Sequence, residues 1–540
     1  MQVKEEQRKN LFNFRPFLFS ATFLALGIYF YFQLYFHGVS VRWLLFLLPL
    51  AVAPFFFCRK GKSFYYTFLS VVLLILSFFI GYFSLSKQLD SFHETDGVGG
   101  TSVFGTVVDR REYPNVSGFV LKGITIDGKR YDGKLIAYLP TSFSNSIGLG
   151  DEILLGGNVR VNELESKNFS LQAVDFGEDI RYRVYTNSAT IVGYRFQPLL
   201  FLRSRAEAVI DAGMDADAAG VTKAILFGEK DGIEASLYKN IRYGGIAHIF
   251  AVSGLHIGAL FAFCLFFIKK SPLRTANALL RWGIITVILF LYAGLCEFSS
   301  SVVRAFILCS LSYGASCLRI KKDRLELLAV AAILILLFTP SALFEVGFQL
   351  SFAACFGIVL LAKPIGQVCD EIRKPFVSKA SKKNLSFDQI LLAQDRNRAF
   401  EKVVGFLSVS LAAQIATAPI QLFYFGYVSG WALLLNCLFV PAIGVLFPIL
   451  LGLVAIACLL PVAFASIVLY LPNLLWAMGL LLFYAFDFSG IALYQTVGVG
   501  MVFCYVFACL FMSDKFDVSR FTRVLFTLTF FCAFILRCLL

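Results

Sequence analysis

Long apolar runs recur through this 540-residue sequence and constrain its fold more than any other feature. A run of about 18 or more apolar residues with few charges matches the length of an α-helix that crosses the hydrocarbon core of a bilayer. Apolar residues make up 58% of the chain and charged residues 15%, whereas a soluble domain is about half apolar and about a quarter charged. We therefore predict a polytopic α-helical membrane protein and exclude soluble enzyme folds for most of the chain.

The apolar runs predict about 12–13 spans, some of them broken. The run over 431–460 must cross once in net despite its 30 residues, and Pro441 and Pro448 within it favour a kinked or broken crossing. The first run lacks a small-residue cleavage site and is followed by further runs, so we interpret it as a retained helix and not as a signal peptide. The predicted spans are 17–36, 43–57, 64–86, 246–268, 282–298, 299–318, 325–339, 341–361, 403–422, 431–460, 466–486, 491–512 and 524–540.

Basic residues gather in the short segments between these spans. The net charge is +13, from 48 Lys and Arg against 35 Asp and Glu. With the predicted spans, every basic cluster falls on one side of the membrane, which the positive-inside rule makes the cytoplasmic side. The N-terminus is then cytoplasmic and residues 87–245 are extracytoplasmic, so the charge indicates topology and is not evidence for a polyanionic partner. The clusters are Lys4–Arg15, Arg59–Lys62, Lys269–Arg281, Arg319–Arg324, 363–402 and Lys515–Arg523.

The polar stretch over 87–195 has a different pattern. Short runs of alternating β-branched residues are separated by the tight-turn signals Asp127-Gly128 and Asp132-Gly133. Such a pattern predicts a small antiparallel β-barrel of the OB type. Its charges nearly cancel, so its composition provides no strong electrostatic reason to bind DNA.

The segment after this domain has helical periodicity. Leu199, Leu202 and Ala206 recur at helical spacing opposite Arg203 and Glu207, which suits either a helix in the membrane surface or a short globular helix. The predicted organisation is three N-terminal transmembrane helices (1–86), an extracytoplasmic OB-like domain (87–195), an amphipathic or interfacial connector (196–245), a transmembrane core (246–512) and a C-terminal transmembrane helix with no soluble C-terminal domain (513–540).

The densest polar motif is the segment Ser253–Gly258. Gly254 and Gly258 form a G-x-x-x-G face that permits close helix approach. Ser253 and His256, three residues apart, share one helical face. Three interpretations are open: a polar site that lines a passage, helix packing with His256 hydrogen-bonded to a neighbour, or a Ser/His nucleophilic pair, which lacks an acidic orienting residue nearby in the sequence.

Polar residues within the other spans allow similar alternatives. Arg304 offers a guanidinium fork for phosphate, or it forms an intramembrane pair with Glu297 or Glu345. Gln349 and Gln414 line a passage or tie helices together by hydrogen bonds.

The motifs, taken in order, resemble the ComEC family of competence proteins. Ala224–Asp231 followed by Tyr243–Gly258 resembles the family signature. The usual Asn-Pro-Gly element near the end of the external domain is missing, and the external domain resembles the family's only weakly. Further matches occur at Ser299–Ala305, at Pro340 with Phe344–Phe352, at Ser408–Gln421 and at Leu435–Pro441.

The resemblance implies an inner-membrane channel component that imports single-stranded transforming DNA in natural competence. It also implies a separate ATPase or helicase motor and a DNA receptor, besides the lipid bilayer; a nuclease supplied in trans and a homo-oligomer are left open. The alternative functions are transport of another solute by a ComEC-like membrane protein, a ComEC-like protein without a DNA-uptake role, and an intramembrane hydrolase using Ser253 and His256. The residues proposed to line the channel or form its core are Ser253, Gly254, His256, Gly258, Arg304, Gln349, Ser351, Gln414 and Asn436.

Several signals of enzymatic chemistry are missing from the sequence. Many ComEC relatives carry a metallo-β-lactamase-like domain, whose zinc site typically begins H-x-H-x-D-H. The four histidines here form no H-x-H, and Gly61-Lys62-Ser63 lacks the upstream glycine of a phosphate-binding loop. The 13 cysteines form no C-x-x-C pair and none lies within the polar stretch. We therefore expect no metal, no cofactor and no enzymatic activity in this chain.

Overall fold

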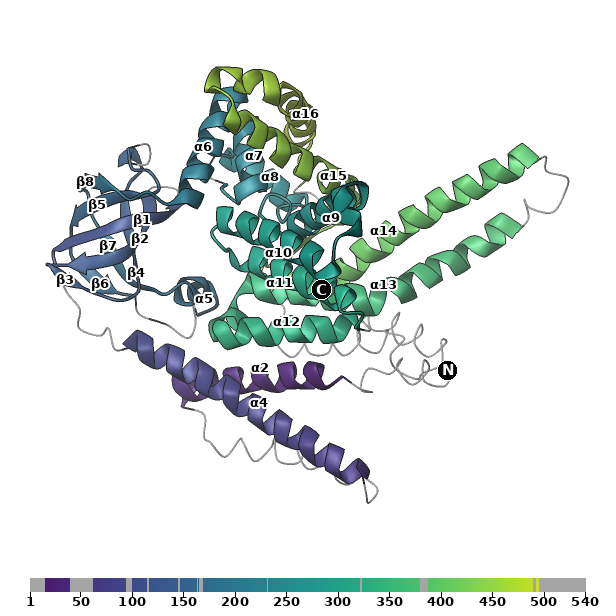
Figure 1. Cartoon of the computed structure of the whole chain (residues 1–540), viewed down its shortest axis with the longest axis horizontal. Coiled ribbons are helices and arrows are strands. Elements are labelled where there is room, and N and C mark those ends of the chain that lie inside the picture. Colours follow the sequence, from purple (N-terminus) through teal and green to yellow (C-terminus); the bar gives the residue numbers. More distant parts are fainter. Residues whose placement is uncertain are drawn as a thin grey trace.

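A β domain and a larger helical body make up the described part of the chain (Figure 1). Helix α2 and helix α4 cross each other along one side of the body, and α13 and α14 form a long antiparallel pair that projects from it. The computed structural model describes residues 15–38, 62–93, 100–113, 116–143, 146–162, 164, 169–230, 232–320, 323–378, 387–488 and 492–494.

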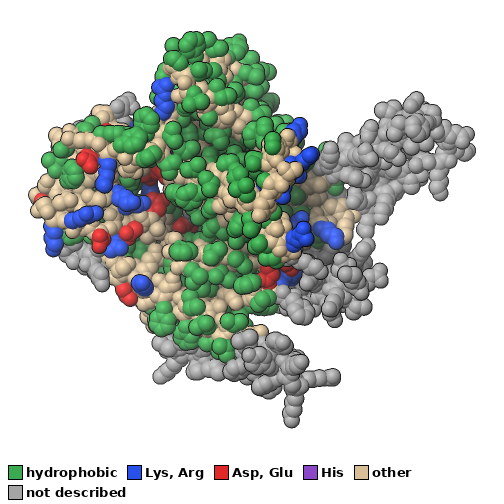
Figure 2. Space-filling view, viewed as in Figure 1, with side chains coloured by type: hydrophobic (Ala, Val, Ile, Leu, Met, Phe, Trp, Pro, Cys, Tyr) green, Lys and Arg blue, Asp and Glu red, His purple; other side chains and the backbone are tan. Residues whose placement is uncertain are grey.

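Seven of the described helices are long and apolar enough to cross a membrane, by length and composition. The prediction of a polytopic helical membrane protein is thereby confirmed. Hydrophobic side chains cover most of the visible surface of the helical body in Figure 2, as expected where lipid is the solvent. The helices of the body are α2 (Pro16–His37), α4 (Lys62–His93), α9 (Gly254–Lys270), α10 (Ala278–Leu295), α11 (Ser300–Cys317), α12 (Arg324–Phe338), α13 (Val346–Ser378), α14 (Phe387–Phe425), α15 (Ala432–Leu459) and α16 (Ala465–Ala485).

Local sequence signals set where several of these helices begin. Asn277 caps α10 and Asp323 caps α12, each by accepting a hydrogen bond from the backbone N–H two residues later, at 3.0 and 2.9 Å. Asp323 also accepts a hydrogen bond from Arg15 at 2.9 Å, which joins the start of α12 to the start of α2. The other end of α12 leads into the 3₁₀ turn η4 (Pro340–Phe344), which packs against the β domain's helix α5 (Phe169–Gly177). Arg15 and Arg324, one residue from each of two predicted basic clusters, therefore lie at the end of α12 remote from the β domain.

Three span predictions need correction. Helix α9 begins only at Gly254, so the predicted span over 246–268 is shortened to 17 residues. Of the two alternatives predicted for 431–460, the broken crossing is wrong, since α15 continues as one helix through Pro441 and Pro448, and the kinked crossing stays a prediction; a membrane helix can keep its proline when neighbouring helices satisfy the freed backbone groups. Residues 492–494 form strand β10, paired with β9 (Tyr427–Ser429), where the sequence predicted the start of a span.

The predicted spans over 43–57 and 524–540, and the remainder of 491–512, lie outside the described residues.

The β domain is a mixed sheet and not a closed antiparallel barrel. Its main path runs β6-β7-β4-β2-β1-β5-β8, with β3 paired to β2. Strand β4 pairs with β7 in parallel. Parallel neighbours need a long crossover connection, and the connection here includes helix α5, which the sequence did not predict. The OB-like barrel is therefore not confirmed. The strands are β1 (Ser102–Glu112), β2 (Val116–Ile126), β3 (Lys129–Arg130), β4 (Lys134–Pro140), β5 (Asp151–Gly156), β6 (Val159–Val161), β7 (Ile180–Tyr185) and β8 (Ala189–Tyr194), with the 3₁₀ turn η2 (Thr141–Phe143) after β4.

One face of this sheet packs into a core of its own, made of residues between Val103 and Val184. The turn signals act as predicted: Asp127 and Gly128 both adopt positive φ, +46° and +81°, at the tight turn between β2 and β3. The core is formed by Val103, Val107, Phe119, Leu121, Ile124, Ile126, Leu135, Ala137, Leu139, Ile147, Ile153, Leu155, Val159, Tyr182 and Val184.

The connector after the β domain forms the helices α6 (Pro198–Gly213), α7 (Ala216–Phe227) and α8 (Ala235–Tyr243). The helical prediction for α6 is right, but its predicted polar face is not. Arg203 is buried, and Leu202, predicted to belong to the apolar face, is exposed. Arg203 faces inward because three carboxylates surround it, that of Glu207 on the same helix and those of Glu229 and Glu297 from two other parts of the chain.

Helices α2 and α4 pack backbone against backbone in the described part of the body. A Cβ added to Gly27 would lie 2.0 Å from the Phe78 carbonyl oxygen, and one added to Gly81 would lie 2.2 Å from the Leu24 carbonyl oxygen. Two backbones can meet this closely only where both helices carry glycine at the crossing. The two glycines stand on different helices, so no local motif in the sequence predicts this pair.

Candidate functional site

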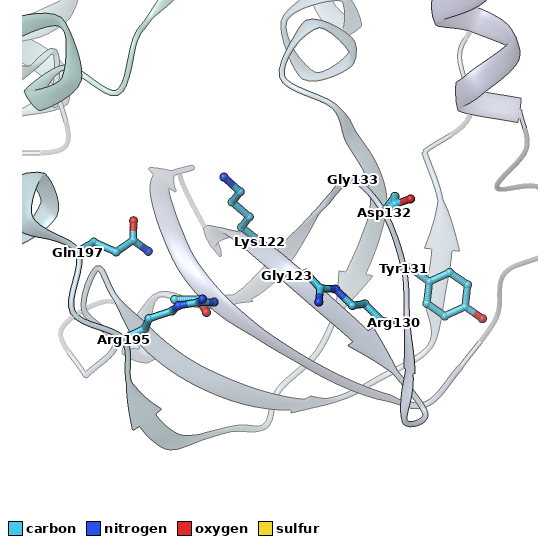
Figure 3. A pocket seen from close by; sticks show the side chains of 9 residues that line it. Lys122, Gly123, Arg130, Tyr131, Asp132, Gly133, Arg195 and Gln197 are labelled. Carbon is cyan, nitrogen blue, oxygen red and sulfur yellow. The ribbon is translucent and has the colours of Figure 1, made fainter. Parts of the chain in front are cut away.

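A basic pocket opens on the β domain and contains about 410 Å³. Lys122 comes from β2, Arg130 from β3 and Arg195 from the segment that follows β8, and Figure 3 shows all three side chains around the hollow, with Tyr131 turned away from it. Asp132 is the acidic residue in the lining. Three cations within one concave surface suit an anionic chain, although the charges of the whole domain nearly cancel. The lining residues are Thr106, Lys122, Gly123, Arg130, Tyr131, Asp132, Gly133, Arg195 and Gln197.

A second charged cluster lies where the β domain meets the helical body. Arg203 of α6 forms ion pairs with Glu207 at 2.7 Å, with Glu229 at 3.4 Å and with Glu297. These three carboxylates come from α6, from the loop after α7 and from the turn between α10 and α11. Glu297 adopts a positive φ of +56°, a conformation that is costly for a residue with a side chain and that this contact helps to hold.

A matching arginine lies on the β-domain side of the same junction. Arg111 of β1 forms ion pairs with Asp109 at 3.1 Å and with Asp175 and Glu178 at 2.7 Å each, so it ties β1 to α5. Asp109 also interacts electrostatically with Glu297, which connects the two arginine-centred groups. We call these two arginines and six carboxylates the junction cluster. Acidic side chains border the hollow between the two bodies in Figure 2.

The excess of carboxylates in the junction cluster shifts its protonation equilibria. Desolvation by burial, together with the charge of Glu229, raises the pKa of Glu207 to about 7 against the opposing charge of Arg203. Desolvation likewise raises the pKa of Glu178. For Arg111 desolvation by burial acts in the opposite direction, but the charges of Glu178, Asp109 and Asp175 outweigh it and raise the pKa. The junction cluster therefore keeps its arginines charged and favours the protonated form of Glu207 and Glu178.

The predicted Ser253/His256 pair forms a helix cap. The Ser253 hydroxyl accepts a hydrogen bond from the Leu255 N–H at 3.3 Å, and Nδ1 of His256 accepts one from the Ser253 N–H at 3.0 Å. His256 is fully buried with its ring edge against Phe447, 4.7 Å between centroids. This reciprocal arrangement starts α9 and supports the hydrogen-bonded packing interpretation.

The two glycines beside this cap make no close helix contact among the described residues. A Cβ on Gly254 would lie 3.6 Å from that of Ala305, an ordinary contact, and one on Gly258 would meet nothing within 4 Å. The G-x-x-x-G face therefore does not act here as a helix-crossing motif within the described part of the chain.

Arg304 lies inside the helical body with Glu345 as its electrostatic partner. Both side chains are at most 5% exposed, and the Arg304 guanidinium lies 5.9 Å from the centre of the Phe348 ring. Of the two acidic partners considered for Arg304, Glu345 fits and Glu297 does not, since Glu297 contacts Arg203. A buried arginine without a carboxylate nearby would be very costly in this environment.

The remaining predicted residues are spread over several helices. The Gln349 side-chain amide donates to the Leu343 carbonyl oxygen at 3.0 Å, and that of Gln414 donates to the Ser410 hydroxyl at 3.2 Å. Both bonds are local in sequence, so neither ties two distant helices together. Asn436 has a buried side-chain oxygen, and Ser351 is partly buried on α13. The structure thus brings Arg304 close to the start of α13, where Gln349 lies, but does not gather all nine residues into one site.

Sequence comparisons bear on this core of the helical body. The sequence model of the Competence protein family matches residues 225–516, which include more than half of the chain. The chain belongs to the Competence protein family. This confirms the resemblance on which the sequence analysis relied.

Two curated relatives are similar to part of this chain. ComE operon protein 3 of Bacillus subtilis is 26% identical over 243 residues, which are 45% of this chain and 27% of that protein. The protein MG316 of Mycoplasma genitalium is 29% identical over 192 residues, which are 35% of this chain and 46% of MG316. The aligned parts thus span less than half the length of either relative. No solved structure matches the chain.

The family region contains most of the buried polar groups described above. It starts within α7, and it includes the Ser253/His256 cap, the Arg304–Glu345 pair and all of α13 to α16. It excludes the β domain with its basic pocket and excludes Arg203. The junction cluster therefore joins the competence-family core, through Glu229 and Glu297, to a domain that the family model does not cover.

Proposed function

We propose that this chain is an inner-membrane channel component for the import of single-stranded transforming DNA in natural competence. The observation that carries the proposal is the match of the Competence family over 225–516, within a polytopic helical body. In the proposed topology the basic ends of the helices are cytoplasmic and the β domain is extracytoplasmic. The positions of Arg15 and Arg324, both at the end of α12 remote from the β domain, support that orientation.

The basic pocket is the proposed first contact for DNA. Lys122, Arg130 and Arg195 would neutralise backbone phosphates, which releases counterions and makes binding depend on salt. A sequence-independent contact of this kind suits a protein that must accept DNA of any sequence. In the helical body Ser253, His256, Arg304, Gln349 and Gln414 remain the proposed residues that line or shape the path.

Energy and processing would come from other proteins. We propose a separate ATPase or helicase motor and a separate DNA receptor as partners, because the sequence has no phosphate-binding loop of its own. We propose no enzymatic role for the Ser253/His256 pair, since its histidine nitrogen accepts a backbone hydrogen bond within a helix cap.

The decisive experiment measures entry of fluorescently labelled DNA into the cytosol after deletion of the gene, with complementation by wild type and by a Lys122→Ala/Arg130→Ala/Arg195→Ala variant. We expect deletion to abolish entry and the triple variant to reduce it at matched protein levels. Arg160→Ala, an exposed basic residue of β6 outside the pocket, is the matched control. Unchanged DNA uptake and transformation in the deletion strain would contradict the proposal.

A second candidate is transport of another solute without a DNA-uptake role. The observation that favours it is the junction cluster, in which six carboxylates and two arginines lie between the β domain and the helical body, where they would repel a polyanion. Titrating the full chain in detergent with a single-stranded oligonucleotide at several salt concentrations distinguishes the two. Salt-sensitive binding supports DNA, whereas no binding at low salt supports the alternative.

A further inference from the structure

A second hollow of about 480 Å³ on the β domain has a lining without any charged side chain. In this it differs from the basic pocket on the same domain, where three cations and one carboxylate meet. It lies where β4 and β7 end. Its lining residues are Val116, Tyr138, Leu139, Pro140, Gly156, Tyr185, Thr186, Asn187 and Ser188, and we call it the tyrosine groove.

Two tyrosines of this groove stack on each other. Tyr138 and Tyr185 occupy paired positions of the parallel strands β4 and β7, so their side chains leave the same face of the sheet as neighbours. Their ring centroids are 4.7 Å apart and their planes differ by 15°. Tyr113 packs on the other side of Tyr138 with 5.7 Å between centroids, above Gly118, which has no side chain to fill that space.

The outer face of the Tyr185 ring is open. The next strand, β6, begins at Val159, which pairs with Val184, so the ladder ends before it reaches Tyr185. Tyr185 is accordingly 61% exposed. A large aromatic ring held against a second ring, with one face in solvent, is a rigid stacking platform that loses little conformational entropy when a ligand covers it.

Hydrogen-bonding groups flank this platform at a fixed position. The Thr186 hydroxyl donates to the Gly156 carbonyl oxygen and accepts from the Ser188 N–H at 3.1 Å, which holds the turn between β7 and β8 against the end of β5. Asn187 and Ser188 in that turn are exposed. Their amide and hydroxyl groups can both donate and accept, so they match ligand groups that also do both.

These features together select a neutral ligand that has a flat apolar face and hydroxyl groups around its edge. A pyranose ring has that form: its axial C–H bonds carry partial positive charge toward the negative face of an aromatic ring, and its hydroxyls project sideways. A nucleic acid would need cations beside its phosphates. Arg183 lies two residues before Tyr185 on the same face of β7 but does not line the groove.

We propose that the tyrosine groove binds a neutral saccharide chain, with one sugar ring stacked on Tyr185 and its hydroxyls bonded by Asn187 and Ser188. This goes beyond the proposed DNA import and shares with it only the extracytoplasmic placement of the β domain. The groove would attach that domain to glycan at the cell surface.

The test is saturation-transfer NMR on the full chain in a sugar-free detergent, with a tetramer of β-1,4-linked N-acetylglucosamine as the probe. We expect binding with a Kd of about 1 mM or tighter and a loss of at least about fivefold for Tyr185→Ala. Tyr185→Phe should bind as wild type does, because it keeps the stacking ring and the fold. Tyr194→Ala is the matched control, since it removes an exposed tyrosine from β8 outside the groove.

Two results would overturn the proposal. One is no saturation transfer to wild type, or equal binding by wild type and Tyr185→Ala. The other is displacement of the saccharide by a 20-nucleotide oligothymidine whose affinity also falls in Tyr185→Ala, which would make the groove a nucleic-acid site. DNA uptake is measured separately, so a failure of DNA import leaves the saccharide result standing, and the reverse also holds.

Discussion

Arg203 at the junction forms ion pairs with three carboxylates, whereas Glu345 is the carboxylate that interacts with Arg304 among the described residues of the helical body. The junction lies at the edge of the β domain, so water can share the cost of excess negative charge, and an acidic cluster can persist there by holding protons. Inside the body each charge must be matched closely, because desolvation is most costly where lipid and apolar side chains replace water. The charges of the junction cluster are therefore shared among several groups at the edge of the β domain, whereas Arg304 and Glu345 in the described part of the body are matched with each other.

The largest effect expected from this difference is that of Arg203→Ala. Removing the shared cation leaves Glu207, Glu229 and Glu297 facing one another, and we expect a loss of about 3–5 kcal/mol of stability. Thermal unfolding of the full chain in detergent, followed by intrinsic fluorescence, measures it.

Arg205→Ala on the same helix is the control. The Arg205 guanidinium donates to the Leu460 carbonyl oxygen in an exposed contact, so its loss should cost less than about 1 kcal/mol. Equal losses of stability in Arg203→Ala and Arg205→Ala would contradict a stabilising role for the cation that the three carboxylates share.

The next largest effect concerns Arg304 and Glu345 inside the helical body. Arg304→Gln should cost about 3 kcal/mol because it leaves Glu345 buried without its cation. Adding Glu345→Gln should restore at least half of that loss, as a double-mutant cycle in the same unfolding assay would show. A double variant less stable than Arg304→Gln would contradict one-to-one pairing.

A variant that changes helix packing without changing charge provides a comparison for the stability effects of the two arginine variants. Gly81→Ala places a methyl group 2.2 Å from the Leu24 carbonyl oxygen, so α2 and α4 must separate, at a cost of about 1–3 kcal/mol. Gly258→Ala meets open space and should be neutral or stabilising, since alanine favours helix by up to about 1 kcal/mol. Unfolding temperatures in the opposite order would mean that the backbone contact is not what holds the α2–α4 crossing.

A smaller effect is expected from Glu207→Gln, and it depends on pH. The pKa of Glu207 is raised to about 7 in the folded state, so folding favours its protonated form. Its stabilising contribution is present below the unfolded pKa of about 4.3 and is lost as pH rises through about 7. Glutamine copies the protonated form, so Glu207→Gln should stabilise by about 1–2 kcal/mol at pH 8 and by much less at pH 5. Equal stabilisation at both pH values would contradict a proton held at the junction.

The smallest effect on stability is that of Lys122→Ala, which should leave the unfolding temperature unchanged because the side chain lines an open pocket. Its effect should be on binding: the slope of log affinity for single-stranded DNA against log salt should fall by about 1. Arg160→Ala, outside the pocket, should change that slope less. An unchanged slope in Lys122→Ala would remove the basic pocket from the proposed DNA path.

Sequence reasoning succeeded where the signal was local or one-dimensional. Apolar runs predicted the membrane helices, Asp127-Gly128 predicted a turn, and the ordered motifs from Ala224 onward predicted the family. It failed at Arg203, where helical periodicity placed a charge on the solvent side although carboxylates up to 94 residues away draw it inward. It also placed Ser253 and His256 on one face but could not show that they bond each other as a cap.

What the sequence determined by itself is the membrane class, the polar insertion between helices and the membership of the Competence family, because each depends on length, composition or residue order. Only the tertiary structure decided which arginine meets which carboxylate, that β4 and β7 pair in parallel, and that Tyr138 and Tyr185 stack. These features depend on contacts between residues far apart in the chain. Such contacts leave no period or spacing in the sequence, since burial and electrostatic pairing are decided by the neighbours that folding brings together.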